Sequence, residues 1–399
     1  MGLNETVSAE RIHIGFFGLR NAGKSSLVNA VTGQSLSVVS DVKGTTTDPV
    51  KKAMELLPLG PVVIIDTPGF DDEGLLGEKR VEKTNEILSK IHIAVLVTDA
   101  SGDFTEKEAE LIELFKKREI PYIVAYNKSD VYGKDIDLKD NEVLVSALKA
   151  ENIDLLKEKI GALSKSLSKP RYIIGDKLDE GDTVIMVTPI DESAPKGRLI
   201  LPQQLTLREI LDKKCTAIVC QPEQLKGTVE NLKNKPRLVI TDSQVFGKVA
   251  KILPVDVPLT SFSILMARYK GDLEALVEGA SKLKCIKDGD KILISEGCTH
   301  HRQCNDIGTV KMPDWIRTFT GCEPEFYFTS GGEFPEDLNG YSLVVHCGGC
   351  MLNEKEMKYR QNKAQEQGVP MVNYGVAIAM MHGILKRSLA IFPDVAERI

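Results

Sequence analysis

The amino-acid sequence predicts an α/β fold built from three modules with mostly parallel sheets. Two observations predict this class. Short apolar runs typical of buried strands alternate along the chain with stretches of helical periodicity, a rhythm that favours parallel sheets covered on both faces. A chain of 399 residues is also longer than a domain with a single hydrophobic core usually is, which predicts more than one module. We expect modules at residues 1–168, 169–265 and 266–399.

The overall composition narrows the class of protein. Apolar residues make up 42% of the chain and charged residues 27%, which is typical of a globular protein in water. The net charge of −6 counts against a nucleic-acid partner, because gripping a phosphate backbone needs a basic surface. The longest apolar run begins at Gly375 and is too short to span a bilayer, so it predicts a buried helix. We expect a cytoplasmic protein without a membrane partner.

Residues 11–31 predict a strand, a glycine-rich loop and a helix. The loop from Gly18 to Ser25 reads G-L-R-N-A-G-K-S, a pattern whose backbone N–H groups cradle phosphates. In this pattern Lys24 reaches the β- and γ-phosphate oxygens and Ser25 coordinates Mg²⁺. The flanking strand and helix are the context that the pattern requires.

The next motifs follow in the order of a nucleotide-hydrolysing switch. Residues 44–48 read G-T-T-T-D and offer hydroxyls to the metal and the γ-phosphate, with Thr46 as the second predicted Mg²⁺ ligand. The buried run at 61–69 contains Asp66, a carboxylate for the outer shell of the Mg²⁺, and Gly69, whose N–H can sense the γ-phosphate.

Two further apolar runs, at 93–99 and 121–127, predict strands of the same parallel sheet. The second leads into Asn127, Lys128 and Asp130. An aspartate there can accept hydrogen bonds from both N1–H and the exocyclic amine of guanine, which adenine does not offer. Ser146 and Ala147 follow, placed to close over the base. Five motifs in this order predict a GTPase domain.

We therefore assign two overlapping sets of residues. The predicted hydrolytic set is Asn21, Lys24, Ser25, Asp66 and Gly69. The predicted nucleotide-binding set is Gly18, Asn21, Ala22, Gly23, Lys24, Ser25, Ser26, Thr45, Thr46, Thr47, Asp66, Gly69, Asn127, Lys128, Asp130, Ser146 and Ala147.

This first module resembles the tRNA-modification and ribosome-assembly GTPases of bacteria, within the Ras-like superfamily. Ras-type proteins have a water-orienting glutamine directly after the glycine, where this chain has Phe70. Asn21 matches the position that binds K⁺ in the resembling group. The resemblance therefore implies slow GTP hydrolysis stimulated by K⁺. The alternative is that Asn21 is a turn residue suited to the left-handed backbone region.

The middle module predicts another small parallel sheet but no chemistry of its own. Residues 183–191 and 197–202 favour a hairpin or a pair of strands, and alternating helices and strands follow. Because neither a phosphate loop nor a cluster of titratable residues stands out, we interpret this module as a dimerisation or docking element.

Cysteines and histidines gather in the last module. Five of the eight cysteines lie between residues 298 and 350, in the company of His300, His301 and His346. Both cysteine groups follow predicted strands, one through Gly297 and the other through His346. A helix is predicted after the second group, with Asn353 and Glu356 as its N-cap and capping-box pair.

Spacing alone leaves three interpretations open. A structural zinc site would combine three cysteines with one histidine. A thioredoxin-like pair would use Cys347 and Cys350 only. A [4Fe–4S] cluster held by Cys298, Cys347 and Cys350 would leave one iron with an exchangeable ligand.

The pattern Cys298-x-His300, followed later by His346-Cys347-x-x-Cys350, resembles the signature of the [FeFe]-hydrogenase maturation GTPases, as does the order of the three modules. The resemblance implies a [4Fe–4S] cluster on the three cysteines, with His300 and His346 as candidates for a labile fourth position. It also implies a homodimeric scaffold that receives a diiron precursor from radical-SAM maturases and delivers it to apo-[FeFe]-hydrogenase.

Two other functions remain as alternatives. One is a translation- or ribosome-associated GTPase with a C-terminal zinc domain, against which the acidic balance counts. The other is a GTP-driven disulfide reductase, which leaves Cys298 and the histidines unused.

Overall fold

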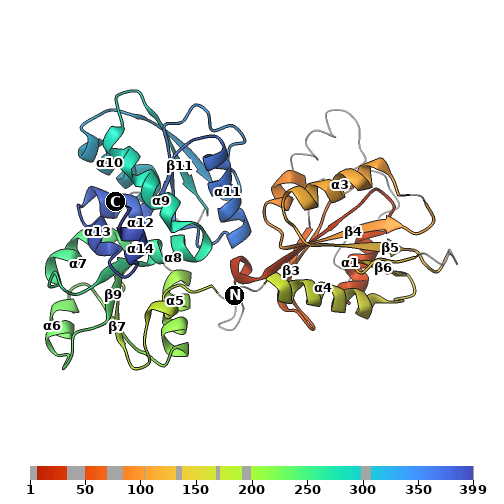
Figure 1. Ribbon diagram of the computed structural model, residues 1–399, viewed down its shortest axis with the longest axis horizontal. Coiled ribbons are helices and arrows are strands. Elements are labelled where there is room, and N and C mark those ends of the chain that lie inside the picture. Colours follow the sequence, from red (N-terminus) through yellow and green to blue (C-terminus); the bar gives the residue numbers. More distant parts are fainter. Residues whose placement is uncertain are drawn as a thin grey trace. The chain divides into compact units, whose positions relative to one another are not determined.

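The computed structural model describes residues 7–33, 50–69, 84–102, 104–131, 137–167, 171–190, 199–297 and 307–398. Its internal contacts divide the chain into two compact units, Met1–Pro170 and Arg171–Ile399 (Figure 1). Both units are α/β, which confirms the predicted fold class. No helix within the described ranges is long and apolar enough to cross a membrane.

The first unit contains a six-stranded sheet with the order β2-β3-β1-β4-β5-β6. All of its pairings are parallel except that of β2 with β3. One face is covered by α1 and α4 and the other by α3 (Figure 1). The described elements with defined bounds are η1 (Ser8–Glu10), β1 (Ile12–Phe17), α1 (Lys24–Thr32), β2 (Val50–Leu56), β3 (Gly60–Asp66), β4 (Ile93–Asp99), α3 (Glu106–Lys117), β5 (Tyr122–Asn127), β6 (Glu142–Leu144) and α4 (Ile153–Leu167).

The central strands show why apolar runs predict this sheet. In β4 every residue from Ile93 to Val97 is fully buried, because helices cover both faces of the sheet. The helix α3 begins with a capping box in which Thr105 and Glu108 satisfy each other's backbone N–H groups. Local sequence therefore sets both the strands and the helix boundary.

The second unit contains two four-stranded sheets, ordered β10-β9-β7-β8 and β12-β11-β13-β14. Every pairing within them is parallel. The elements of the first sheet and its helices are η2 (Gly175–Lys177), β7 (Thr183–Val187), α5 (Leu201–Asp212), β8 (Thr216–Cys220), α6 (Leu225–Glu230), β9 (Leu238–Thr241), η3 (Ser243–Val245), α7 (Phe246–Ile252), β10 (Leu259–Ser261) and α8 (Phe262–Lys270). Those that follow are α9 (Leu273–Ala280), η4 (Ser281–Cys285), β11 (Lys291–Glu296), η5 (Ile307–Lys311), α10 (Met312–Thr320), β12 (Glu325–Ser330), β13 (Leu343–His346), α11 (Glu354–Glu366), β14 (Met371–Asn373), α12 (Tyr374–Met381), α13 (Leu385–Ser388) and α14 (Pro393–Ala396).

One expected element of this unit is wrong. The sequence predicts a strand at 197–202 that pairs with the strand beginning at Thr183, but α5 begins at Leu201 instead. Pro202 lies in the first turn of α5, where its missing N–H costs no helical hydrogen bond. Within the described sheet, β7 pairs with β8 and β9 rather than with a hairpin partner.

The two sheets of the second unit share one hydrophobic core, which contains residues of β7, β9, β11 and β13. The buried helix α12 is the apolar run after Gly375, which confirms that prediction. The helix α8 connects the sheets: it follows β10 directly, and Ser261 caps its first turn. Asn373, at the end of β14, donates a 2.8 Å hydrogen bond to the Ser263 carbonyl of α8.

A glycine at the contact between α9 and β14 tests this packing. A Cβ on Gly279 would lie 2.0 Å from the Met371 carbonyl oxygen, so Gly279→Ala should lower the free energy of unfolding by about 1–3 kcal/mol. Gly227 in α6 has open space around it, and Gly227→Ala is the matched control, with an expected gain of about 0.5–1 kcal/mol.

Trp315 is the single tryptophan of the chain and packs against the core of the second unit, so its fluorescence during urea unfolding reports this unit. Equal unfolding midpoints for the two variants would contradict the close packing of α9 on β14.

Candidate functional site

The phosphate loop joins β1 to α1 and depends on two glycines. Gly18 and Gly23 have φ angles of 147° and 84°, where side chains are strained. A Cβ on Gly18 would also lie 2.1 Å from the Val97 carbonyl oxygen, and one on Gly23 would lie 2.3 Å from Nδ2 of Asn127. Asn21 lies between them with a φ of 60°. The loop therefore takes the tight course that brings backbone N–H groups to a phosphate.

Lys24 is the first residue of α1 and is only 8% exposed. Its Nζ donates to the carbonyl oxygens of Gly18, at 3.0 Å, and Leu19, at 2.8 Å. These bonds hold the ammonium inside the loop, at the helix N-terminus where an anion is favoured. Ser26, the third residue of α1, lies in the same first turn.

Ser25 and Asp66 meet beside this loop. The Ser25 hydroxyl donates a 2.7 Å hydrogen bond to Oδ2 of Asp66. The other carboxylate oxygen of Asp66, Oδ1, is buried and has no hydrogen-bond donor among the described residues. A buried carboxylate oxygen in this state is costly unless a cation or water satisfies it, so the pair fits Mg²⁺. The other predicted Mg²⁺ ligand, Thr46, and the predicted nucleotide-binding residues Thr45 and Thr47 lie outside the described residues.

The base site is organised by Asn127, at the end of β5. Its Nδ2 donates to the Ala22 carbonyl at 3.0 Å, and its Oδ1 accepts from the Ala147 N–H at 3.0 Å. One side chain thus joins the phosphate loop to the loop that closes over the base. Ser146 is fully buried and donates a 2.6 Å hydrogen bond to Asp130 Oδ1, which fixes the orientation of that carboxylate.

Lys128 has a partner that the sequence analysis missed. Its Nζ donates a 2.5 Å hydrogen bond to Oδ2 of Asp99, the last residue of β4. The sequence contained a signal for this contact, since Asp99 ends the apolar run of the neighbouring predicted strand. In the structure Asp99 is the register partner of Asn127, the residue before Lys128. Gly69 follows β3 as the last residue before a gap in the described ranges, and Phe70 lies outside them.

These placements gather the described part of the predicted nucleotide-binding set at one edge of the sheet. Gly18 follows β1, Asp66 ends β3 and Asn127 ends β5, so the set lies at the carboxyl ends of parallel strands. Open α/β sheets bind ligands at this edge.

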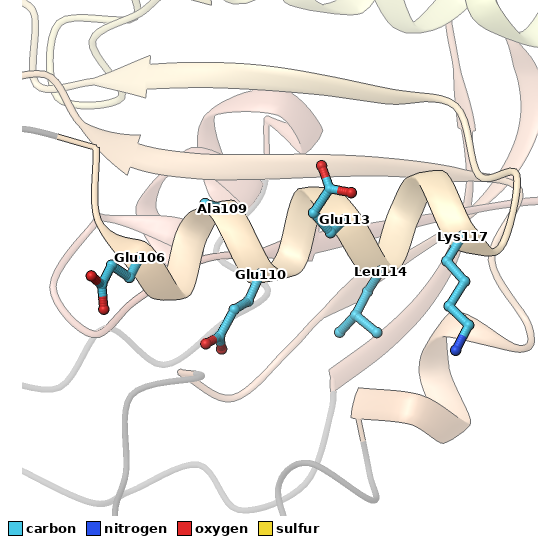
Figure 2. A pocket seen from close by; sticks show the side chains of 6 residues that line it. All are labelled: Glu106, Ala109, Glu110, Glu113, Leu114 and Lys117. Atoms are coloured by element: carbon cyan, nitrogen blue, oxygen red, sulfur yellow. The ribbon is translucent and has the colours of Figure 1, made fainter.

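A pocket of about 710 Å³ lies along α3 and is separate from the predicted nucleotide-binding set (Figure 2). Figure 2 shows Glu110, Leu114 and Lys117 pointing to the same side of the helix. Its lining comes from α3 alone and contains no predicted site residue, and we assign it no part in nucleotide binding.

The described cysteines of the second site follow β13. The Cys347 N–H donates to the Ser295 carbonyl at 3.0 Å, which continues the parallel pairing of β13 with β11. The Cys347 sulfur accepts from the N–H groups of Gly297, at 3.0 Å, and Gly349, at 3.3 Å. Two backbone donors stabilise negative charge on the sulfur, so this position fits a metal-bound thiolate.

Cys298, His300 and Cys304 lie outside the described residues. Gly297, which precedes Cys298 in the sequence, is the residue whose N–H meets the Cys347 sulfur. Within the described ranges, no three His, Cys, Asp or Glu side chains converge as a metal site. Of the predicted cluster residues, only Cys347, Cys350 and His346 fall in those ranges.

His346 is fully buried, and both of its ring nitrogens are engaged. Nδ1 lies 2.8 Å from the Cys347 carbonyl oxygen and Nε2 lies 3.1 Å from Nη1 of Arg360. Because arginine only donates, Nε2 accepts and Nδ1 carries the proton. Burial, and then the charge of Arg360, lower the pKa of His346 to about 3, so the ring is neutral. Binding a metal would require one of these contacts to break.

Arg360 is a second residue that the sequence analysis missed. It is 1% exposed, and its Nη2 donates to Glu356 Oε1 and to the Gly331 carbonyl, both at 2.7 Å. The predicted N-cap is confirmed, since the Asn353 side chain accepts from the Glu356 N–H. The Glu356 carboxylate pairs with Arg360 one helical turn later, a spacing that was visible in the sequence.

Cys350 is the other described ligand candidate. Burial raises the pKa of its thiol, and the nearby charge of Lys270 acts in the opposite direction. A buried thiol with a cation close by suits a ligand that ionises when it binds metal.

Three family models match the chain in sequence order. Residues 13–128 match the 50S ribosome-binding GTPase model. Residues 173–271 match the hydrogen maturase F dimerization domain, and residues 274–391 match the hydrogen maturase F tetramerization domain. The first match confirms that the N-terminal module is a GTPase domain.

Individual proteins resemble part of the chain. GTPase Der of Wolinella succinogenes is 36% identical over 174 residues, which cover 40% of this chain and 37% of that protein. The tRNA modification GTPase MnmE of Clostridioides difficile is 33% identical over 155 residues, which cover 37% and 33%. The chain thus spans about a third of the length of these curated relatives. A solved structure of a probable GTP-binding protein engB has 23% identity and a TM-score of 0.32, covering 39% of this chain and 99% of that chain.

Asp130→Asn tests the assignment of guanine recognition. The amide keeps an oxygen that can accept from Ser146 but presents an N–H donor where guanine needs an acceptor. We expect GDP to bind about 10- to 100-fold more weakly, as for a lost hydrogen bond to a charged group. XDP, whose C2 carbonyl accepts that donor, should bind more tightly than to the wild type. Isothermal titration calorimetry with both nucleotides measures this, and unchanged GDP affinity would remove Asp130 from the base site.

Proposed function

Because the chain belongs to the hydrogen maturase F family, we propose that it is a GTP-hydrolysing scaffold that carries a diiron precursor to apo-[FeFe]-hydrogenase. The dimerization and tetramerization models of that family together match more than half of the 399 residues, behind a GTPase domain. The alternative of a ribosome-associated GTPase with a zinc domain leaves these two modules without a role.

The observation that carries the proposal is the position of the Cys347 sulfur. Two backbone N–H groups donate to it, and one belongs to Gly297, the neighbour of Cys298. This arrangement supports a [4Fe–4S] cluster held by Cys298, Cys347 and Cys350. When bound, such a cluster supplies one iron with an exchangeable ligand, the chemistry that a carried precursor needs.

His300 and His346 are the proposed candidates for the fourth position, and the contacts of His346 count against it. His346 already holds the Cys347 carbonyl and Arg360 through its two nitrogens. We therefore rank His300, which lies outside the described residues, before it.

The nucleotide site is the proposed switch. Ser25 and Asp66 would hold Mg²⁺, Lys24 would meet the β- and γ-phosphates, and Asp130 would recognise guanine. Loops that contact the γ-phosphate change their order when GTP is hydrolysed. We propose that this change biases docking or release of the radical-SAM maturases and the apo-hydrogenase.

We further propose a cytoplasmic homodimer. The module at 173–271 contains β8, an edge strand of its sheet on which Val219 is 41% exposed. An edge of this kind can pair with a strand from a second copy.

The delivery assay tests the function. The chain is produced together with its radical-SAM partners, purified without oxygen and mixed with apo-[FeFe]-hydrogenase, and hydrogen evolution is measured. Wild type and Cys285→Ser should activate the hydrogenase equally, because Cys285 is exposed and outside the site. Cys347→Ser and Cys350→Ser should give no activation. Full activation by Cys350→Ser would rule out delivery through this site.

The dependence of GTP hydrolysis on K⁺ tests the role of Asn21. We expect the rate in K⁺ to exceed that in Na⁺ at least about tenfold, which corresponds to about 1.4 kcal/mol of transition-state stabilisation. Asn21→Gly keeps the left-handed backbone, with its φ of 60°, but removes the amide, so it should lose the K⁺ effect while still binding GDP. If Asn21→Gly retains full K⁺ stimulation, Asn21 is only a turn residue.

A further inference from the structure

The turn that carries Cys350 is held by Lys270, a residue within the matched dimerization domain at 173–271. Lys270 is the last residue of α8 and is 1% exposed. Its Nζ donates to the carbonyl oxygens of Leu352, at 2.7 Å, Cys350, at 2.9 Å, and Gly349, at 3.4 Å. Three carbonyls from one short turn therefore converge on a single ammonium.

The backbone that carries Lys270 is itself fixed. The Gly271 N–H closes the last turn of α8 on the Ala267 carbonyl at 3.0 Å. The Asp272 N–H donates to Oε1 of Gln361 on α11, at 2.9 Å. A Cβ on Gly271 would lie 2.4 Å from the same Gln361 oxygen, so α8 and α11 meet closely here. The close contact of these two helices therefore fixes the position of the Lys270 ammonium.

The orientation of the turn's peptides links these carbonyls to the sulfurs. In a trans peptide the C=O and the N–H point in opposite directions. The carbonyl of Cys350 faces Lys270, so the N–H of the same peptide group, on Met351, points away from the ammonium, and it acts to lower the pKa of the Cys350 thiol. The carbonyl of Gly349 also faces Lys270, so the N–H of that peptide group, on Cys350, points away from the ammonium as well. The Gly349 N–H, in the peptide group directly before these two, donates to the Cys347 sulfur. By holding the two carbonyls, Lys270 fixes the peptide groups that adjoin this sulfur contact.

We propose that Lys270 is a positioning residue that orients the Cys347–Leu352 turn so that its N–H groups hydrogen-bond the cysteine sulfurs. The inference rests on the proposed function where it concerns the cluster. Hydrogen bonds to sulfur and a nearby positive charge both stabilise a reduced cluster, so Lys270 raises its reduction potential. It also makes a residue of the dimerization module, which matches residues 173–271, part of the cysteine site.

The first test needs no metal. Hydrogen–deuterium exchange is measured by mass spectrometry on the peptide that covers residues 347–352 of the full-length apo chain. Lys270→Met removes the donor with little change in length, and exchange there should become at least about tenfold faster. The exposed Lys284→Met makes the same change in net charge and should leave the exchange unchanged. Unchanged exchange in a folded Lys270→Met protein overturns the proposal.

The second test uses the chain reconstituted with iron and sulfide. A redox titration followed by electron paramagnetic resonance should show the reduction equilibrium of Lys270→Met shifted about tenfold toward the oxidised form, or about 59 mV for one electron. Lys270→Arg, which keeps the charge, should restore part of the shift, and Lys284→Met should match wild type. An unchanged potential overturns the claim about the cluster.

Two controls keep the outcomes distinct. Trp315 fluorescence reports whether the second unit of each variant is folded. If Lys270→Met does not fold, Lys270→Gln takes its place. Its amide is uncharged and ends one bond short of the ammonium, so a wild-type potential and exchange rate in that variant overturn the proposal. If wild type binds no iron and sulfide while the exchange result holds, the proposed function fails and the positioning role stands.

Discussion

The hydrogen bond from the Cys347 N–H to the Ser295 carbonyl is the interaction on which the second site depends. It extends the register of β11 and β13, in which Ser295 faces His346, by one residue beyond the end of β13. The carboxyl ends of parallel strands lie at the same edge of a sheet. The two segments that carry the cysteine motifs therefore leave their strands side by side, and the Gly297 N–H reaches the Cys347 sulfur. The two cysteine motifs are about 50 residues apart in the sequence, and this strand pairing is what brings them together.

The same constraint builds the nucleotide site in the other unit. There the phosphate loop follows β1, while Asp66 ends β3 and Asn127 ends β5. All three lie at one edge of the sheet, at the carboxyl ends of parallel strands. The two sites differ in how their turns are fixed. The phosphate loop is closed by its own lysine, which donates to loop carbonyls, and by Asn127. The cysteine turn is held by Lys270 of α8, and His346, directly before the turn, is held by Arg360 of α11.

The sequence predicted what depends on local pattern. The buried strands, the phosphate loop and the N-cap at Asn353 are each determined by residues close together in the chain, and the structure contains them. The start of α5 was missed because a short apolar segment with a proline fits a strand edge as well as a first helical turn. The partners of His346 and the role of Lys270 were missed for a different reason. These contacts join residues brought together only by packing, such as Lys270 and Leu352, and no periodicity marks them.

The central claim is that the cysteines of the second unit hold an iron–sulfur cluster. The most direct measurement is the content of iron, acid-labile sulfide and zinc in the full-length chain purified without oxygen, with electron paramagnetic resonance of the reduced sample. We predict about four irons and four sulfides per chain, with a reduced-state signal that Cys298→Ala abolishes. Tightly bound zinc without labile sulfide would contradict the claim, and would favour a zinc-stabilised module attached to a GTPase.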